Sequence, residues 1–465
     1  MKNKVNYLHL LLWVVTVPFL TVSCDGSKGE GPETDLSPCT ITSIFPTSGT
    51  PGTVITLTGK GFGTDKSKVA VQVGTVDSAP IMLVTNTKIQ LRAPEGFSDY
   101  NANIHVTVSS STSNTVEFYY GDTVTPMITT VTTTCFYHST VVITGKNFSP
   151  VKEENSVKFG EIEAEVTDAT NTSLTVITPD LGTANSAEIT VTKSGKVSNI
   201  QNISVDQDQN KVATYDWPTH TVRTGITYKT AELTLFGSLR RLHILDVALT
   251  DNNTLGIGVA TPHKATTTIC NDDYHAIVGI NAGYFPFGDS NDKDPYIRID
   301  KETVQAGHLD VNPMFTNAAL TIRNNVATVR KFTDGGRNQN LLAAAIPVSE
   351  AENVIVCGPM LITSGVLENV DMSNSHNSSL TGRTGLGVTA DGKRVFMIVV
   401  DYNGGVTGVS TQQLAKILQA LGAVDAMNFD GGGSSTMFVK NMGDNGRVST
   451  NTNLQRPVKS VIYVK

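Results

Sequence analysis

An internal repeat constrains the fold of this chain more than any other feature of its sequence. Residues 54–62 and 141–148 share a run of Val, Ile and Thr that ends in Gly-Lys-x-Phe. Matched residues keep an offset of 85 or 86 positions: Gly59 with Gly145, Phe62 with Phe148, Gly74 with Gly160, and Pro94 with Pro179. A constant offset over several anchor residues indicates two copies of one structural unit.

Each copy has the pattern of a β-sandwich. Short runs of β-branched residues, such as 104–108 and 189–191, alternate with turns rich in Gly, Asn and Asp. Charged residues make up only 17% of the whole chain, and Thr and Val are plentiful, which favours strands over long helices. We therefore expect all-β sandwiches at residues 39–121 and 122–206.

The first copy resembles the IPT/TIG family. It opens with Ile44-Phe45-Pro46-Thr47-Ser48-Gly49 and continues into Gly59-x-Gly61-Phe62, as members of that family do. The second copy lacks the opening Pro and Gly, so we expect its first turn to be remodelled. The resemblance implies immunoglobulin-like sandwiches that act as spacers or binding modules, and a spacer without a ligand is the interpretation we favour.

The N-terminus has the organisation of an export signal. Lys2 and Lys4 precede an apolar run from Leu8 to Leu20, and polar residues follow Cys24 at once. A charged start, a short apolar core and a small residue before the cut are typical of such signals. The run is too short for a comfortable membrane span.

A cysteine placed directly after such a core resembles the lipobox of bacterial lipoproteins, although Thr21 stands where that motif usually has Leu. The resemblance implies that residues 1–23 are removed and that Cys24 carries a lipid. The Gly-, Ser-, Pro- and acid-rich composition that follows predicts a flexible tether at 24–38. The protein would then be exported and lipid-anchored to the bacterial cell envelope, at the outer membrane or cell surface. Plain secretion with an unmodified Cys24 is the alternative.

Four further cysteines, Cys39, Cys135, Cys270 and Cys357, leave two possibilities open. None forms a Cys-x-x-Cys pair, so a structural zinc site is not expected. An exported protein can form disulfides, and a bond between Cys39 and Cys135 is one option because each opens a repeat. Buried free thiols are an equal alternative.

The character of the chain changes beyond the polar segment 206–216, which we interpret as a linker. Near-continuous apolar runs, at 242–249, 277–280, 354–356 and 395–400, are typical of strands covered on both faces. One helix is indicated by Ser410 at its cap, Gln413 three residues on, and a stop at Gly422. We predict an α+β domain with a mixed sheet at 210–465.

Two carboxylates follow predicted strands of this domain. Asp401 comes directly after 395–400, and Asp430 comes after 424–429. A strand end is a rigid place to hold a charge at the mouth of a cleft. Asp430 runs into a glycine-rich turn whose backbone N–H groups can form a nest for an anion, with two hydroxyls beside it. The residues of this turn are Gly431, Gly432, Gly433, Ser434 and Ser435. An ordinary tight turn is the alternative.

Two more segments carry polar groups next to glycines. The Asn281 amide can both donate and accept hydrogen bonds, and Tyr284 can stack on a sugar ring or fill the core. Arg383, followed by Thr384, precedes a strand and presents a planar fork suited to two phosphate oxygens. Taken alone, core packing and a solvated surface arginine are the simpler interpretations of these residues.

Together the segments resemble the phosphodiester glycosidase family over about residues 210–465. The family's motifs appear in order: Asn281-Ala-Gly-Tyr-Phe285, Gly358-Pro-Met-Leu-Ile362, Arg383-Thr384, Val400-Asp-Tyr-Asn-Gly404 and Asn428-Phe-Asp-Gly-Gly-Gly-Ser-Ser-Thr436. The last block is the most specific of them. Ala282 and Gly382 depart from the family pattern, but neither removes a polar side chain.

The resemblance implies a hydrolase that cleaves sugar-1-phosphodiesters, such as N-acetylglucosamine-1-phosphodiesters, between the anomeric carbon and its oxygen. Its transition state would resemble an oxocarbenium ion, with negative charge growing on the departing phosphate. We expect Arg383 and the amides of residues 431–433 to stabilise that charge. We expect Asp430, or secondly Asp401, to steady the ring or activate water, and Asn281 or the two serines to hold sugar hydroxyls.

The expected partners are a glycan or sugar-phosphate substrate and, through the lipid, a membrane. The small net charge of -7 and the lack of a basic stripe argue against nucleic acid. No cofactor is required, although Asp401 and Asp430 together could host calcium or magnesium; His243, His275, His308 and His376 are scattered singly. A metal-dependent phosphodiesterase that cuts the P–O bond, and a non-enzymatic glycan-binding adhesion protein, remain alternatives.

Overall fold

The computed structural model describes residues 38–97, 100–120, 125–285, 295–306, 316–332, 345–449, 451 and 454–465. The chain divides into two compact units, Met1–Val124 and Thr125–Lys465. The predicted signal peptide, Cys24 and all of the tether but its last residue lie outside the described residues. No described helix is both long enough and apolar enough to cross a membrane.

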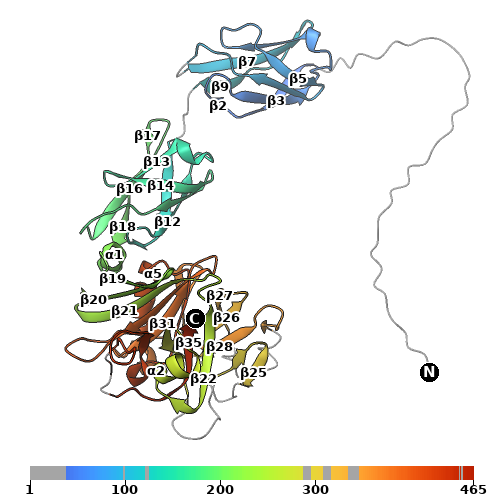
Figure 1. Cartoon of the computed structure of the whole chain (residues 1–465). Coiled ribbons are helices and arrows are strands. Elements are labelled where there is room, and N and C mark those ends of the chain that lie inside the picture. Colours follow the sequence, from blue (N-terminus) through green and yellow to red (C-terminus); the bar gives the residue numbers. More distant parts are fainter. Residues whose placement is uncertain are drawn as a thin grey trace, which may run out of the picture. The chain divides into compact units, whose positions relative to one another are not determined.

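The first unit holds a two-sheet sandwich, drawn in blue in Figure 1. One sheet has the order β1-β3-β6-β5 and the other β2-β9-β7-β4, with β8 paired to β7. The strands are β1 (Thr40–Phe45), β2 (Ser48–Gly49), β3 (Val54–Lys60), β4 (Val69–Val73), β5 (Ile81–Thr85), β6 (Lys88–Arg92), β7 (Tyr100–Val108), β8 (Ser111–Thr112) and β9 (Val116–Tyr120). Alternate residues of the facing strands point inward and form one buried core.

The second copy forms the same kind of sandwich at the start of the second unit. Its strands are β10 (Met127–Val131), β11 (Thr134–Cys135), β12 (Thr140–Lys146), β13 (Asn155–Phe159), β14 (Ile162–Ala169), β15 (Ser173–Ile177), β16 (Ser186–Lys193), β17 (Lys196–Val197) and β18 (Gln201–Val205). β14 pairs with both β13 and β15 and so links the two layers. Two β-sandwiches in tandem are therefore confirmed.

Close packing explains why the repeat preserves its glycine and phenylalanine. A Cβ on Gly59 would lie 2.1 Å from the Thr40 carbonyl oxygen and 2.4 Å from the Phe62 ring. A Cβ on Gly145 would meet the second sandwich in the same way, 2.4 Å from the ring of Phe148. Both phenylalanines are buried. Each glycine thus makes room for its ring and for the neighbouring strand, which are features of one shared fold.

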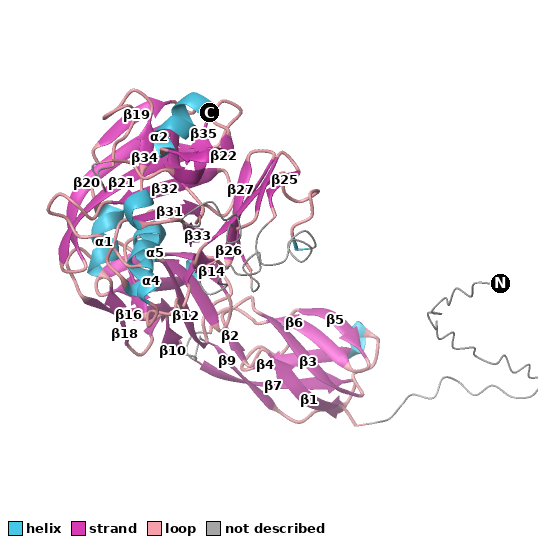
Figure 2. Cartoon of the chain, turned by 90° about the horizontal axis from the view of Figure 1, so that it is seen from below, coloured by secondary structure: helices cyan, strands magenta, loops and turns pink. Residues whose placement is uncertain are grey.

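Three sheets build the rest of the second unit (Figure 2). The largest has the order β19-β20-β21-β32-β31-β33-β29-β30, and the others have the orders β22-β35-β23-β34 and β25-β24-β28-β26-β27. The largest sheet contains β19 (Thr219–Arg223), β20 (Ile226–Leu235), β21 (Ser238–Ala248), β29 (Met360–Thr363), β30 (Val366–Leu367), β31 (Arg383–Val388), β32 (Arg394–Val400) and β33 (Asp425–Asn428).

The two smaller sheets contain β22 (Leu255–Lys264), β23 (Val278–Asn281), β24 (Ile297–Ile299), β25 (Glu302–Gln305), β26 (Ala318–Arg323), β27 (Val326–Lys331), β28 (Asn353–Cys357), β34 (Met437–Val439) and β35 (Val458–Val464). Short helices accompany them: α2 (Thr266–Thr268), α4 (Ser375–Ser378) and α5 (Thr411–Ala420). The predicted helix is confirmed in α5, where Ser410 and Gln413 form the capping box.

The predicted α+β class with a mixed sheet is not confirmed for this domain. It is mostly β, and every described pair of its strands is antiparallel. The apolar runs do mark strands buried on both faces: Leu242 and Ile398 pack toward α5, whereas Leu245 and Met397 pack toward the other sheets. A second sheet thus covers the face that helices cover in a parallel-sheet protein.

The polar segment expected as a linker contains a short helix, α1 (Gln207–Thr214), that contacts both of its neighbours. Asn210 is buried; it accepts from the Tyr137 N–H at 3.0 Å and donates to the Gly182 carbonyl at 2.9 Å, both in the second sandwich. On its other side Gln209 donates to the Gln419 side chain at 2.7 Å in α5. The helix therefore joins the two domains through buried amides.

Asn210→Ala is expected to lower the thermal stability of the full chain. It removes the acceptor of the part-buried Tyr137 N–H and one donor to the Gly182 carbonyl, at a cost of about 1–3 kcal/mol for each group that stays dry. Thermal unfolding followed by circular dichroism measures the loss. Asn171→Ala, on an exposed turn, is the matched control. An unfolding curve for Asn210→Ala that coincides with that of the control would show that the hydrogen bonds of Asn210 do not stabilise the contact between α1 and the second sandwich.

Cys39, Cys135, Cys270 and Cys357 are all buried free thiols. The structure thus favours the second of the two sequence possibilities, and the Cys39–Cys135 disulfide is not formed. Burial raises the pKa of Cys357 to about 12 and that of Cys135 to about 11. Both side chains therefore behave as small apolar groups at neutral pH.

Candidate active site

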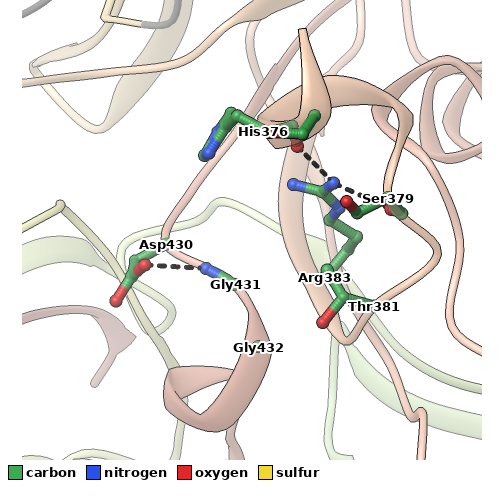
Figure 3. Close-up of a pocket in the computed structure, with 8 residues that line it drawn as sticks. His376, Ser379, Thr381, Arg383, Asp430, Gly431 and Gly432 are labelled. Carbon is green, nitrogen blue, oxygen red and sulfur yellow. Dashed lines mark hydrogen bonds between the residues drawn. The ribbon is translucent and has the colours of Figure 1, made fainter.

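Antiparallel pairing of β31 with β33 brings Arg383 and Asp430 together. The register matches Gly385 with Asn428 and Leu386 with Met427, so its extension by two residues sets Arg383 opposite Asp430. Both side chains line one pocket of about 460 Å³, on two sides of it in Figure 3. The lining residues are Ser375, His376, Ser379, Thr381, Arg383, Asp430, Gly431 and Gly432.

The Asp430 carboxylate is held at the edge of this pocket. Its Oδ1 accepts the Gly431 N–H at 2.9 Å, and its own N–H donates to the Ala282 carbonyl at 2.9 Å. Burial raises the pKa of Asp430 to about 6, although Ser434, the Gly431 N–H and the charge of Arg456 oppose the shift. A carboxyl group tuned toward neutral pH is typical of catalytic acids and bases.

Arg383 is 2% exposed, and three backbone carbonyls hold its guanidinium. Nε donates to Val409 at 3.2 Å, and Nη2 donates to His376 at 2.5 Å and to Ser379 at 3.1 Å. Nη1 makes no hydrogen bond with any described residue. A guanidinium fixed by its other nitrogens can present Nη1 to an anion in the pocket at little cost in side-chain entropy.

His376 also lines the pocket, although no motif in the sequence singled it out. Its Nε2 lies 2.8 Å from the Tyr284 hydroxyl, which itself lies 2.6 Å from the Gly358 carbonyl oxygen and accepts from Asn428. Burial, and then the charge of Arg383, lower the pKa of His376 to about 4. The imidazole is therefore neutral at neutral pH, and Arg383 supplies the positive charge among the residues that line the pocket.

Tyr284, Thr384 and Asn281 support the site from behind rather than line the pocket. The Asn281 side chain is fully buried; it donates to the Asp430 carbonyl at 2.7 Å, and its Oδ1 accepts from the Thr384 hydroxyl at 2.7 Å and the Thr436 N–H at 3.0 Å. These bonds use the Oδ1 acceptor and one of the two Nδ2 hydrogens, and the contact between Asn281 and a sugar hydroxyl stays a prediction. The residue fixes the backbone that carries Asp430.

Asn281→Asp is expected to lower turnover by about 10-fold or more and to lower thermal stability. A carboxylate cannot donate to the Asp430 carbonyl, and the change adds a buried charge with no cation described beside it. Steady-state kinetics and thermal unfolding measure the two effects. Asn171→Asp introduces the same change on an exposed turn and serves as the control. Unchanged kcat in Asn281→Asp would show that this amide does not position Asp430.

The glycine turn differs from the predicted anion nest. The Gly431 N–H donates to Asp430 and the Gly432 N–H donates to the Gly382 carbonyl at 2.7 Å, so both amides have partners within the protein. Gly432 adopts φ +59°, and a Cβ on Gly431 would lie 2.8 Å from the Gly382 oxygen. These glycines allow two backbones to approach closely, and the Gly431–Gly432 part of the predicted phosphate nest is not available.

Ser434 and Ser435 are buried below the pocket and do not line it. The Ser434 N–H donates to the Gly431 carbonyl at 3.2 Å, within the turn that follows Asp430. The buried Ser435 Oγ has no hydrogen-bond partner in the described part of the chain. Both serines thus lie outside the pocket lining, and a contact between them and substrate stays a prediction.

Asp401 lies outside the pocket, with a side chain that is 0% exposed. It accepts from His243 Nε2 at 3.1 Å and lies 3.5 Å from Arg241 Nη1; His243 Nδ1 in turn meets the Tyr228 hydroxyl at 2.8 Å. The structure therefore does not bring Asp401 and Asp430 together as a cation site. No group of three or more His, Cys, Asp and Glu side chains within the described ranges is placed to hold a metal ion.

Comparisons with known proteins agree with the two classes of domain described so far. Residues 274–465 match the model of the phosphodiester glycosidase family, and residues 38–120 and 126–209 each match the IPT/TIG domain model. The resemblance predicted from the sequence is thereby confirmed for both parts of the chain. None of the curated proteins matches the sequence.

Solved structures similar to this chain include the catalytic domain of zebrafish N-acetylglucosamine-1-phosphodiester α-N-acetylglucosaminidase, auto-inhibited by its pro-peptide. It is 17% identical, covers 53% of this chain and 85% of its own, and has a TM-score of 0.38. A hypothetical protein from Synechocystis is 13% identical over 89% of this chain and 90% of its own, with a TM-score of 0.39. SGBP-B from a xyloglucan utilization locus of Bacteroides uniformis is 14% identical over 86% and 99%, with a TM-score of 0.24.

Proposed function

We propose that the C-terminal domain hydrolyses sugar-1-phosphodiesters by breaking the bond between the anomeric carbon and its oxygen. The observation that carries the proposal is the shared pocket of Arg383 and Asp430, in which a fixed cation faces a carboxyl group of raised pKa. The match of residues 274–465 to the phosphodiester glycosidase family supports the same reaction class.

The chemistry divides between the two charged groups. The anomeric C–O bond breaks with its electron pair passing to the phosphate oxygen, and a water oxygen forms the new bond to the anomeric carbon. A phosphate monoester has a second pKa of about 6 and leaves without full protonation, so the departing group needs charge stabilisation, which Arg383 Nη1 provides. Asp430 as a carboxylate stabilises the cationic ring or takes the proton of the attacking water.

We also propose that the chain is exported and anchored through a lipid on Cys24. The support is the sequence pattern alone: a charged start, a short apolar run and a cysteine followed by polar residues. Metabolic labelling with an alkyne fatty acid tests it in a bacterium that processes lipoproteins. The label should enter the native chain and not Cys24→Ala; label of equal intensity in both would overturn the proposal.

A turnover assay in H₂¹⁸O tests the enzymatic proposal on the full chain. N-acetylglucosamine-1-phosphodiesters come first in a panel of sugars, because the zebrafish relative's name specifies that sugar. C–O cleavage places the heavy oxygen in the released sugar, whereas label in the phosphate indicates P–O cleavage and overturns the proposal. A parallel arm with EDTA tests the metal-dependent alternative. Binding of the same compounds without turnover would favour the adhesion protein instead.

A further inference from the structure

Gly433, the third glycine of the turn, is a glycine because a side chain would clash with a neighbouring residue. Gly433 does not adopt positive φ, so its backbone conformation does not require glycine. A Cβ at this position, however, would lie 2.8 Å from Nη2, 3.1 Å from Cζ and 3.2 Å from Nε of Arg456. The three atoms belong to one guanidinium, which therefore lies directly against the Gly433 Cα. The glycine makes room for this cation.

Arg456 connects this contact to Asp430. Its Nη1 lies 3.5 Å from the Ser434 Oγ, at the long limit of a hydrogen bond. The Ser434 N–H donates to the Gly431 carbonyl at 3.2 Å, and the Gly431 N–H donates to Asp430 Oδ1 at 2.9 Å. Arg456 leads into β35, and Val461 of that strand pairs with Asn281, the residue that holds the Asp430 carbonyl. The strand that places Arg456 thus also supports the backbone of Asp430.

We infer that Arg456 is a positioning residue of the proposed active site: its guanidinium lies across Gly433, reaches Ser434 and thereby holds the Asp430 carboxylate. The inference rests on the proposed function for its effect on turnover, but the contacts themselves do not. Arg456 does not line the pocket, so its effect reaches the reaction through Asp430 rather than through the substrate.

The charge of Arg456 gives this role a measurable consequence. Its charge favours the ionised form of Asp430 and opposes the rise in pKa that burial causes. Removal of that charge therefore raises the pKa of Asp430 further, and the acid limb of the kcat/KM profile moves to higher pH. A residue that only supported the fold would lower activity without moving this limb.

The kinetic test is a double-mutant cycle in the full chain with Arg456→Ala, Gly433→Ala and both changes together. Each single variant should lower kcat by about 10-fold, with little change in KM, and should move the acid limb upward. The double variant should be no worse than Arg456→Ala, because the added methyl group then meets no guanidinium. Arg330→Ala, which removes an exposed arginine paired with Glu350, is the control.

Two kinetic outcomes would overturn the inference. Multiplying losses in the double variant would show that Gly433 and Arg456 act independently. An effect on KM alone, with an unmoved acid limb, would assign Arg456 to substrate binding instead of positioning.

A second measurement needs no turnover and so separates the inference from the proposed function. The pH dependence of the change in melting temperature caused by Asp430→Asn reports the pKa of Asp430 in the folded chain. The midpoint should lie at higher pH when Arg456→Ala is present. An unmoved midpoint overturns the inference even if the enzyme is active, and a shifted midpoint with no turnover on any substrate refutes the proposed function alone.

Discussion

Asp430→Asn is expected to lower kcat for sugar-1-phosphodiester hydrolysis by about 10²–10⁴-fold, the range associated with a catalytic acid or base. The amide has nearly the shape of the carboxyl group and keeps an oxygen for the Gly431 N–H, so the fold is preserved. It carries no negative charge for the anomeric centre and cannot accept a proton from water. Single-turnover and steady-state assays on the full chain measure the loss, and turnover within 10-fold of the native value would reject the role of Asp430.

The same variant is expected to be more stable than the native protein above pH 6. Burial raises the pKa of Asp430 from 3.8 to about 6, so the folded state prefers the protonated carboxyl group. Its contribution to stability is therefore full below pH 3.8 and is lost as the pH rises through 6. The neutral amide avoids this loss, which amounts to at most about 3 kcal/mol for two pKa units.

Thermal unfolding between pH 4 and pH 8 measures this effect. The gain in melting temperature of Asp430→Asn over the native chain should grow as the pH rises through 6. Asp251→Asn, in an exposed turn, controls for the loss of a surface carboxylate. A gain that is constant with pH, or a loss of stability at pH 8, would contradict the raised pKa.

Arg383→Gln is expected to lower kcat/KM by about 10²–10³-fold, as does the removal of a fixed donor to a developing oxyanion. It should also lower the melting temperature, because the carbonyls of Val409, His376 and Ser379 lose their donor. Arg383→Lys keeps the charge but not the planar fork, so its losses should fall between those of the native chain and Arg383→Gln.

Binding of inorganic phosphate, measured as protection against thermal unfolding, separates the role of Arg383 in anion binding from its structural effect. Phosphate should protect the native chain against thermal unfolding and should protect Arg383→Gln much less. The exposed Arg330→Gln provides the control for loss of a positive charge. A folded Arg383→Gln protein that hydrolyses substrate at the native rate, or that phosphate protects equally, would exclude this arginine from anion binding.

The parts of the fold that sequence predicts best are those set by local spacing. The sandwiches follow from the repeated Gly and Phe, and α5 follows from its capping box and apolar stripe. The type of sheet could not be predicted in this way. A strand covered on both faces has the same apolar composition whether a helix or a second sheet covers it. The runs at 242–249 and 395–400 therefore could not show that the predicted mixed sheet is antiparallel instead.

The same division holds for the candidate site. Asp430 and Arg383 were selected from motifs, and the register of two strands brings them together. Asp401 also follows a strand of this sheet, but its carboxylate pairs with His243 on β21. A pair between two strands that are distant in the chain leaves no local pattern in the sequence. The His376 carbonyl accepts a hydrogen bond from Arg383, and the Arg456 guanidinium lies against Gly433. The Arg456 contact joins segments that are separated in the chain.

The buried amides of α1 also determine where the chain can be divided into fragments. A fragment that starts at residue 210 would cut the helix and expose Gln209's partners on α5, together with the face that Asn210 shares with the second sandwich. Expression of the C-terminal domain without the first sandwich should therefore begin at residue 125, where the compact second unit starts. By this criterion the second immunoglobulin-like domain has to be kept with the C-terminal domain, and the first can be removed.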